Sequence, residues 1–194
     1  DVNSVDTSVK NRRWRPLHAA VHALSDLYAA NALPQHALAI INMAPARSYL
    51  QRQQLTQLMA GSLLALADAR TLLVGGHTSE TDATSAGFAV TGTRAAAPTP
   101  PRLEQDPVLL ITKPVGTGVI MAGGMRLDAQ GEWVTAALDS MALGNGTAAD
   151  ILQPDNPMMT DVTGFGLARH ALNLAERCNF TGVEITLSAV PLLP

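Results

Sequence analysis

The stretch MMTDVTGFG, residues 158–166, decides the fold that we expect for this chain. Two apolar residues lead into Asp161, and small residues then precede the helical pattern LARHALNLAERC. A short strand ending at Asp161 would place its carboxylate at a sheet edge, where α/β proteins bind ligands. Thr163, Gly164 and Gly166 would let the chain turn into a helix whose first amides face an anion. Together these groups would suit a magnesium ion and a phosphate.

The same stretch also allows a simpler interpretation. Asp161 could be the residue that caps an ordinary strand-to-helix turn. Spacing alone favours this second interpretation, because the stretch matches none of the phosphate-loop signatures.

Working outward from this stretch, apolar segments alternate with helical patterns. The helical patterns cover residues 17–28, 48–69, 132–143 and 147–152, and another follows Gly166. The segments expected as strands are 36–43, 71–80 as far as Gly75, 86–93, 107–114, and 183–194, the last strand, which leads to the end of the sequence. Continuous apolar strands that alternate with helices predict an α/β layer fold.

Residues 94–106, RAAAPTPPRLEQD, interrupt this alternation. They contain three prolines and show no periodicity, as is typical of a linker between domains. We therefore expect two domains, residues 1–103 and residues 104–194.

Composition excludes several classes of protein. The 194 residues are 47% hydrophobic and carry a net charge of −3, without the basic patches of nucleic-acid-binding proteins. No apolar run approaches the roughly 18 residues that a membrane span requires. Cys178 is the single cysteine, which excludes an internal disulfide and fits a reducing, cytoplasmic location.

The helix expected over residues 17–28 carries His18, His22 and Asp26 at intervals of four residues, so all three are expected on one polar side. This side could be a solvated face, which is the commonest outcome. It could instead hold a transition metal, although the third ligand would lie two turns away. In a third interpretation, Asp26 alone binds Mg²⁺ while His22 lies near a nucleotide.

Two further places are candidates for phosphate contacts. Gly75, Gly76, His77 and Thr78 follow an apolar segment, where the glycines would expose backbone amides, but a tight turn explains them equally well. Lys113 stands at the end of the segment 107–114, where we favour an ordinary cation over a phosphate contact.

Taken together and in order, several stretches resemble the selenophosphate synthetase (selenide, water dikinase) family of the aminoimidazole ribonucleotide synthetase-like superfamily. The most telling are AAVHALSDLYA (19–29), LVGGHTSE (73–80) and MTDVTGFGLARH (159–170). The sequence GGHTSE and the histidine in VHALSD resemble most the domains fused to a flavin-containing NADH-dehydrogenase-like module.

The resemblance implies a fold and a reaction. The fold would be a two-domain α/β (α+β) arrangement, with an N-terminal ATP-binding and dimerisation domain and a partial C-terminal domain. The reaction would be Mg²⁺-dependent transfer of the γ-phosphoryl group of ATP to selenide, giving selenophosphate, AMP and phosphate. The implied partners are ATP, selenide and a second copy of the chain.

The resemblance also implies roles for particular residues. The implied metal ligands are Asp6, Asp26 and Asp161. The implied ATP-binding residues are Gly75, Gly76, His77, Thr78, Asp26 and His22. Lys113 and Asn145 match recurrent family positions to which no single role is assigned.

The chain also departs from the family pattern. The catalytic Cys or selenocysteine and its Lys are expected upstream of Asp1, and Cys178 is expected to be an ordinary core thiol. The basic run KNRRWR (10–15) replaces an acidic stretch. We therefore expect a chain truncated at both ends or a divergent relative. The alternatives are a non-catalytic nucleotide-binding or scaffolding relative and a superfamily enzyme with another acceptor.

Overall fold

The computed structural model describes residues 15–94, 96–97, 100 and 107–194. Contacts between Cα atoms divide the chain into two compact units. The first unit comprises Asp1–Tyr28 and Ala32–Thr93, and the second comprises Ala29–Asn31 and Arg94–Pro194. The predicted boundary after residue 103 lies outside the described residues and stays a prediction.

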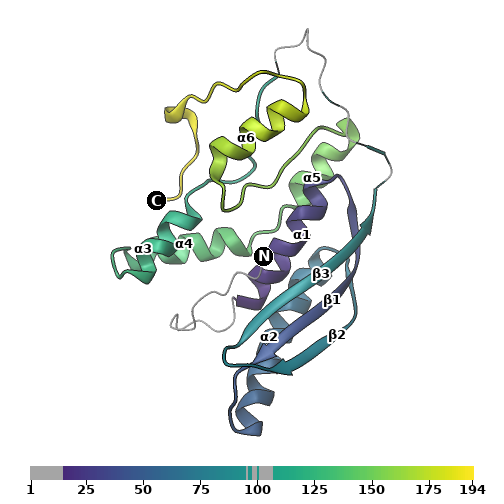
Figure 1. Cartoon of the computed structure of the whole chain (residues 1–194), viewed down its shortest axis with the longest axis vertical. Coiled ribbons are helices and arrows are strands. Elements are labelled where there is room, and N and C mark those ends of the chain that lie inside the picture. Colours follow the sequence, from purple (N-terminus) through teal and green to yellow (C-terminus); the bar gives the residue numbers. More distant parts are fainter. Residues whose placement is uncertain (1–14, 95, 98–99, 101–106) are drawn as a thin grey trace. The chain divides into compact units, whose positions relative to one another are not determined.

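A three-stranded sheet forms the first unit (Figure 1). Its central strand is β1 (Leu33–Met43), which pairs in parallel with β2 (Leu72–Glu80) and antiparallel with β3 (Ser85–Thr93). The parallel neighbours β1 and β2 are connected through α2 (Ser48–Asp68), as a parallel pair requires a crossover. The strand predictions for 36–43 and 86–93 and the helix prediction for 48–69 are confirmed.

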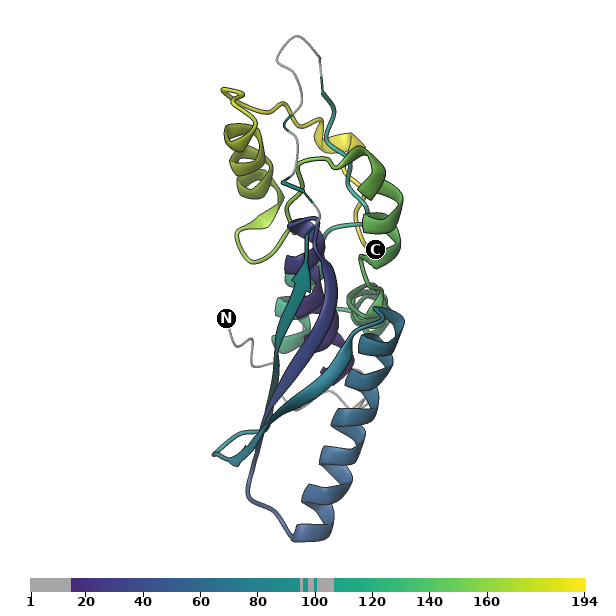
Figure 2. The same cartoon turned by 90° about the vertical axis from the view of Figure 1, so that its right-hand side faces the viewer.

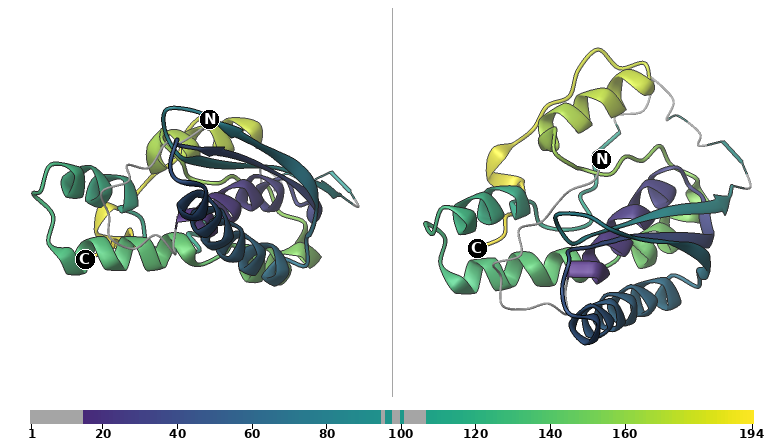
Figure 3. Two further views of the ribbon diagram at one scale, coloured as in Figure 1. Left: turned by 90° about the horizontal axis from the view of Figure 1, so that it is seen from below. Right: turned by 60° about the horizontal axis from the view of Figure 1, so that its bottom comes forward.

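Two helices cover one face of this sheet. Residues of α1 (Arg15–Ala29) and α2 form the buried core together with alternate residues of β1 (Figures 2 and 3). Ala37, Ala39 and Ile41 face these helices because side chains alternate along a strand. Leu38 and Ile40 point to the opposite face, where they are 45% and 51% exposed.

The second unit is mainly helical. Its helices are α3 (Thr117–Met125), α4 (Gly131–Ala142), α5 (Gly146–Leu152) and α6 (Gly166–Arg177). Single turns of 3₁₀ helix lie at Gln153–Asp155 and Leu187–Ala189. The helices predicted from sequence over 132–143, over 147–152 and after Gly166 are confirmed. Within the described residues, no helix is long and apolar enough to cross a membrane.

Three strands predicted for this unit are wrong. Residues 107–114 form no strand, and Val108 is 81% exposed instead of buried. The segment before Asp161 is neither helix nor strand. Residues 183–194 contribute an isolated parallel bridge between Val115 and Leu192. Apolar composition favours extended chain in each case, but a strand also needs a hydrogen-bonded neighbour, which local composition does not provide.

Candidate functional site

The polar side of α1 contains two of the three predicted residues, His22 and Asp26, but not His18. His18 is 8% exposed and lies on the buried side of the helix, whereas His22 and Asp26 are exposed. Because a helix has about 3.6 residues per turn, each step of four residues rotates the side chain further around the axis. The prediction that the three side chains share one polar face is therefore wrong for His18. The described residues also contain no group of three or more His, Cys, Asp or Glu that could hold a metal ion.

The residues Gly75, Gly76, His77 and Thr78 lie inside β2, so the prediction of a turn or loop there is wrong. Gly76 pairs with Ala39 of β1, and a Cβ atom at this position would overlap the Ala39 carbonyl oxygen. The register of the two strands shifts just before, between Ala37 and Leu38. Glycine at position 76 therefore has a structural reason, which is the close approach of two backbones.

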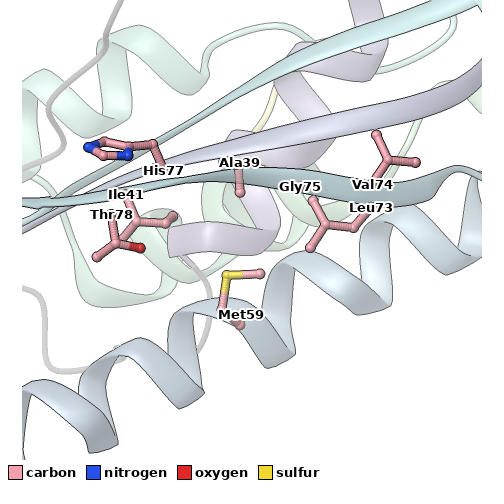
Figure 4. A pocket seen from close by; sticks show the side chains of 9 residues that line it. Ala39, Ile41, Met59, Leu73, Val74, Gly75, His77 and Thr78 are labelled. Atoms are coloured by element: carbon pink, nitrogen blue, oxygen red, sulfur yellow. The ribbon is translucent and has the colours of Figure 1, made fainter.

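A pocket of about 390 Å³ lies along β2. Its lining is mostly apolar and includes Ile41, Met59 of α2 and Leu73, together with all four of the residues Gly75–Thr78. Figure 4 shows His77 pointing away from α2 and Thr78 on the side of the strand that faces α2. The two polar side chains of the pocket therefore lie on opposite faces of the strand, as alternation along a strand requires.

Asp161 is half-buried in the irregular segment that precedes α6. Its Oδ2 atom is buried and has no hydrogen-bond partner among the described residues. A buried carboxylate oxygen without a partner is unfavourable unless a cation or donor occupies the place beside it. This oxygen therefore fits a hard metal ion such as Mg²⁺. The alternative role as a helix cap is wrong, because Phe165 is the N-cap residue of α6 and no side chain caps the helix.

His170, on the second turn of α6, contacts both ends of the Asp161 segment. The backbone N–H of Thr163 donates to its Nε2 atom over 3.2 Å. Its Nδ1 atom lies 3.5 Å from the hydroxyl oxygen of Thr160, and that hydroxyl donates to the Asp161 carbonyl oxygen over 3.4 Å. Gly166 begins the helix with a φ of 79°, which glycine adopts without strain. No sequence pattern predicts this role of His170, and its place on a helix just after Asp161 is the available signal.

Arg177 reaches the same segment from the other end of α6. Its Nη1 atom donates to the Met159 carbonyl oxygen over 3.4 Å. His170 and Arg177 are seven residues apart, which places them on the same side of the helix. Side chains of α6 therefore bind the irregular segment at both of its ends.

Lys113 has a structural partner. Its Nζ atom donates to the carbonyl oxygens of Ser140 and Leu143 over 3.3 and 2.8 Å, at the C-terminal end of α4. Burial lowers the pKa of this amine. These contacts agree with an ordinary structural cation at this position. Asn145 directly precedes α5, and its family role stays a prediction.

Cys178 follows α6 and is 5% exposed. Burial raises the pKa of its thiol, and the positive charge of Arg177 offsets part of that change. A buried thiol with a raised pKa is a poor nucleophile, which agrees with the expected core thiol.

The predicted site residues are thus divided between the two units. His22, Asp26 and the residues of β2 belong to the first unit, and Asp161 belongs to the second. Asp6 lies outside the described residues. The convergence of Asp26 and Asp161 on one metal ion stays a prediction.

Known proteins resemble the chain in sequence. The family described as AIR synthase related protein, N-terminal domain, matches residues 5–94. The selenide, water dikinase of Geobacter metallireducens is 39% identical over 185 residues, which cover 90% of this chain and 51% of the relative. The selenide, water dikinase of Trichlorobacter lovleyi is 38% identical over 180 residues, which cover 90% of this chain and 51% of the relative. The chain thus spans about half the length of the curated relatives it matches.

Solved structures share the fold. Thiamine monophosphate kinase from Aquifex aeolicus matches with a TM-score of 0.62 at 19% identity, covering 89% of this chain and 60% of that one. A structure of AaThiL complexed with AMPPCP and TMP matches with a TM-score of 0.61 at 19% identity. The match covers 87% of this chain and 56% of that one. These likenesses, with the mixed sheet and its helices, confirm the predicted α/β fold.

Proposed function

The chain belongs to the selenide, water dikinase family of AIR synthase related proteins, and from this premise we propose that it takes part in ATP-dependent synthesis of selenophosphate. In the proposed reaction, the bond between the γ-phosphorus of ATP and its bridging oxygen breaks while a phosphorus–selenium bond forms. Water then hydrolyses the remaining ADP to AMP and phosphate. The single buried thiol agrees with a location in the reducing cytoplasm.

The buried, unpartnered Oδ2 atom of Asp161 is the observation that carries the proposal. Phosphoryl transfer depends mainly on alignment and on neutralisation of phosphate charge, which a bound magnesium ion supplies. Asp161 would hold the ion through its buried, unpartnered Oδ2 atom. Asp26 and Asp6 are proposed to contribute further oxygen ligands.

The first unit is proposed to bind the nucleotide. Gly75, Gly76, His77 and Thr78 line the pocket along β2, and His22 is exposed on α1. The fold also occurs in AaThiL, which is complexed with AMPPCP. His77 and Thr78 lie on opposite faces of β2, so a nucleotide bound on one face would contact only one of these two side chains.

The overall reaction is tested on the full-length protein. It is incubated anaerobically with ATP, Mg²⁺ and selenide, and the products are followed by ³¹P NMR. We expect AMP, phosphate and a selenophosphate resonance that requires selenide. Intact ATP after incubation would reject the catalytic proposal.

The role of Asp161 is tested with Asp161→Asn. Loss of one ligand charge should weaken Mg²⁺-dependent nucleotide binding by about ten- to a hundredfold. The free energy of unfolding should change little, because Asn has nearly the same shape as Asp and Asp161 is only half-buried. Calorimetric titration and urea unfolding measure the two effects. Asp155→Asn, which changes an exposed carboxylate of the same unit, is the matched control.

One observation favours a second candidate, a non-catalytic nucleotide-binding relative. The described residues lack a cluster of three or more side chains suited to a metal ion. Nucleotide binding that does not depend on Mg²⁺, together with an unchanged affinity in Asp161→Asn, would support this candidate over the kinase.

The exposed face of the sheet supports a homodimer. Leu38 and Ile40 of β1 are each about half exposed there, and Val74 of β2 is 58% exposed. Apolar side chains gathered on one uncovered sheet face are typical of an interface between proteins. We propose a second copy of this chain as the occupant.

A further inference from the structure

We propose that His170 is a positioning residue for the metal ligand Asp161, which it orients by binding the residues on both sides of it. This inference rests on the proposed function, because it takes Asp161 as a ligand of the magnesium ion. It adds a residue that contacts neither metal nor substrate but sets the conformation of the segment that presents the carboxylate.

The hydrogen bonds fix the state of the imidazole ring. A backbone N–H can only donate, so the Nε2 atom that receives the Thr163 N–H must carry a lone pair. The neutral ring therefore has its proton on Nδ1, which faces the Thr160 hydroxyl oxygen. The Thr163 hydroxyl lies 3.2 Å from Nε2 and competes with the N–H for its one lone pair. The tautomer with its proton on Nδ1 is the one that accepts the Thr163 N–H.

The contacts on the Nδ1 side continue to Asp161 itself. The Thr160 hydroxyl can accept from Nδ1–H while its own proton points to the Asp161 carbonyl oxygen. His170 thus connects to the backbone on the N-terminal side of Asp161 through Thr160, and on the C-terminal side through Thr163. The segment has no strand neighbour, so these side-chain contacts and that of Arg177 replace the hydrogen bonds of a sheet.

The geometry explains why the ring is needed. A carboxylate on an irregular segment can adopt several orientations, and each freely rotating bond reduces the affinity for a metal ion. Partners that orient metal ligands typically change metal affinity by about 10- to 100-fold when they are removed. The ring of Phe165 also lies beside His170, with centroids 6.0 Å apart.

Two substitutions separate hydrogen bonding from packing. In His170→Gln, the side-chain amide reaches the place of Nε2 and can still accept from the Thr163 N–H. In His170→Asn, the amide is one bond shorter, matches only the place of Nδ1, and leaves that N–H without its acceptor. Phe165→Leu is the matched control, because it removes a ring contact and no hydrogen bond.

The test measures Mn²⁺ binding to the full-length protein in the presence of AMPPCP by electron paramagnetic resonance. We expect His170→Asn to bind Mn²⁺ about tenfold more weakly. His170→Gln keeps the Thr163 contact and loses the Thr160 contact, so it should bind more tightly than His170→Asn, and Phe165→Leu should bind close to wild type. Wild-type affinity in His170→Asn, with weakened binding in Asp161→Asn, would overturn the inference and leave the proposed function standing. Wild-type affinity in Asp161→Asn would overturn both.

A second measurement does not depend on the folding of any variant. ¹⁵N NMR of the wild-type histidines distinguishes the two neutral tautomers without metal or nucleotide. We expect His170 to carry its proton on Nδ1, and a proton on Nε2 would overturn the inference.

Discussion

At the scale of single residues, Gly76 shows how one position can have two explanations. The sequence suggests exposed amides for phosphate, whereas the structure shows a backbone that passes too close to Ala39 for any side chain. Both explanations require glycine, so the identity of the residue alone does not separate them.

Gly76→Ala separates them. The added methyl group would push β2 away from β1, and the free energy of unfolding should fall by about 2 kcal/mol or more. Urea unfolding followed by circular dichroism measures this change. Gly87→Ala is the control, because a Cβ atom there meets no neighbour within 4 Å. A Gly76→Ala protein of wild-type stability that has lost only nucleotide affinity would contradict the structural explanation.

The sequence indicates Asp161 as a residue of interest, but the local structure that it predicts there is wrong. It predicts a strand edge, whereas the structure has an irregular segment bound by side chains of α6. Contacts of this kind join residues several positions apart in a specific rotamer, and apolar periodicity contains no information about them.

At the scale of elements, α4 depends on a residue outside it. The last carbonyl groups of a helix have no partner within the helix. Lys113 donates to the Ser140 and Leu143 carbonyl oxygens. Its positive charge also interacts favourably with the negative end of the helix dipole.

Lys113→Met should therefore destabilise the second unit. The substitution keeps most of the apolar stem and removes the donors, so we expect a loss of about 1–2 kcal/mol in the free energy of unfolding. Thermal unfolding measures it, with the exposed Arg126→Met of the same unit as control. Equal stability of the two variants would show that the cap is unimportant.

Helices and strands differ in how far the sequence predicts them. The helices are recognised because their apolar positions repeat within the element itself, as in α6. The segment 107–114 is equally apolar, but its state depends on whether a distant segment pairs with it. Three such strand predictions are wrong for this common reason.

At the scale of the whole molecule, the order of motifs along the chain predicts the family, which the comparisons confirm. The α/β fold follows from the same alternation of helices and strands. What the sequence does not predict is that one face of the sheet is left uncovered within the first unit, because alternation in β1 is compatible with water or with a partner on that face.

Ile40→Lys tests the proposed dimer. A charge in the centre of the exposed sheet face should oppose burial there and convert a dimer to monomers, since an unpaired buried charge costs several kcal/mol. Light scattering after size-exclusion chromatography measures the mass. Leu64→Lys, which changes an apolar residue of α2 that is 62% exposed, is the control. A dimer that persists in Ile40→Lys would place the interface elsewhere.

The buried thiol beside the end of α6 allows the local opening of that helix end to be measured. A thiol reagent can modify Cys178 only in molecules whose helix end has opened, because the sulfur is otherwise inaccessible. Cys178 is the only cysteine among these 194 residues, so the labelling rate measured at this residue reports the frequency of opening at this one place. Arg177, its neighbour, contacts Met159, so the same rate also reports how often the segment around Asp161 loses its support at that end.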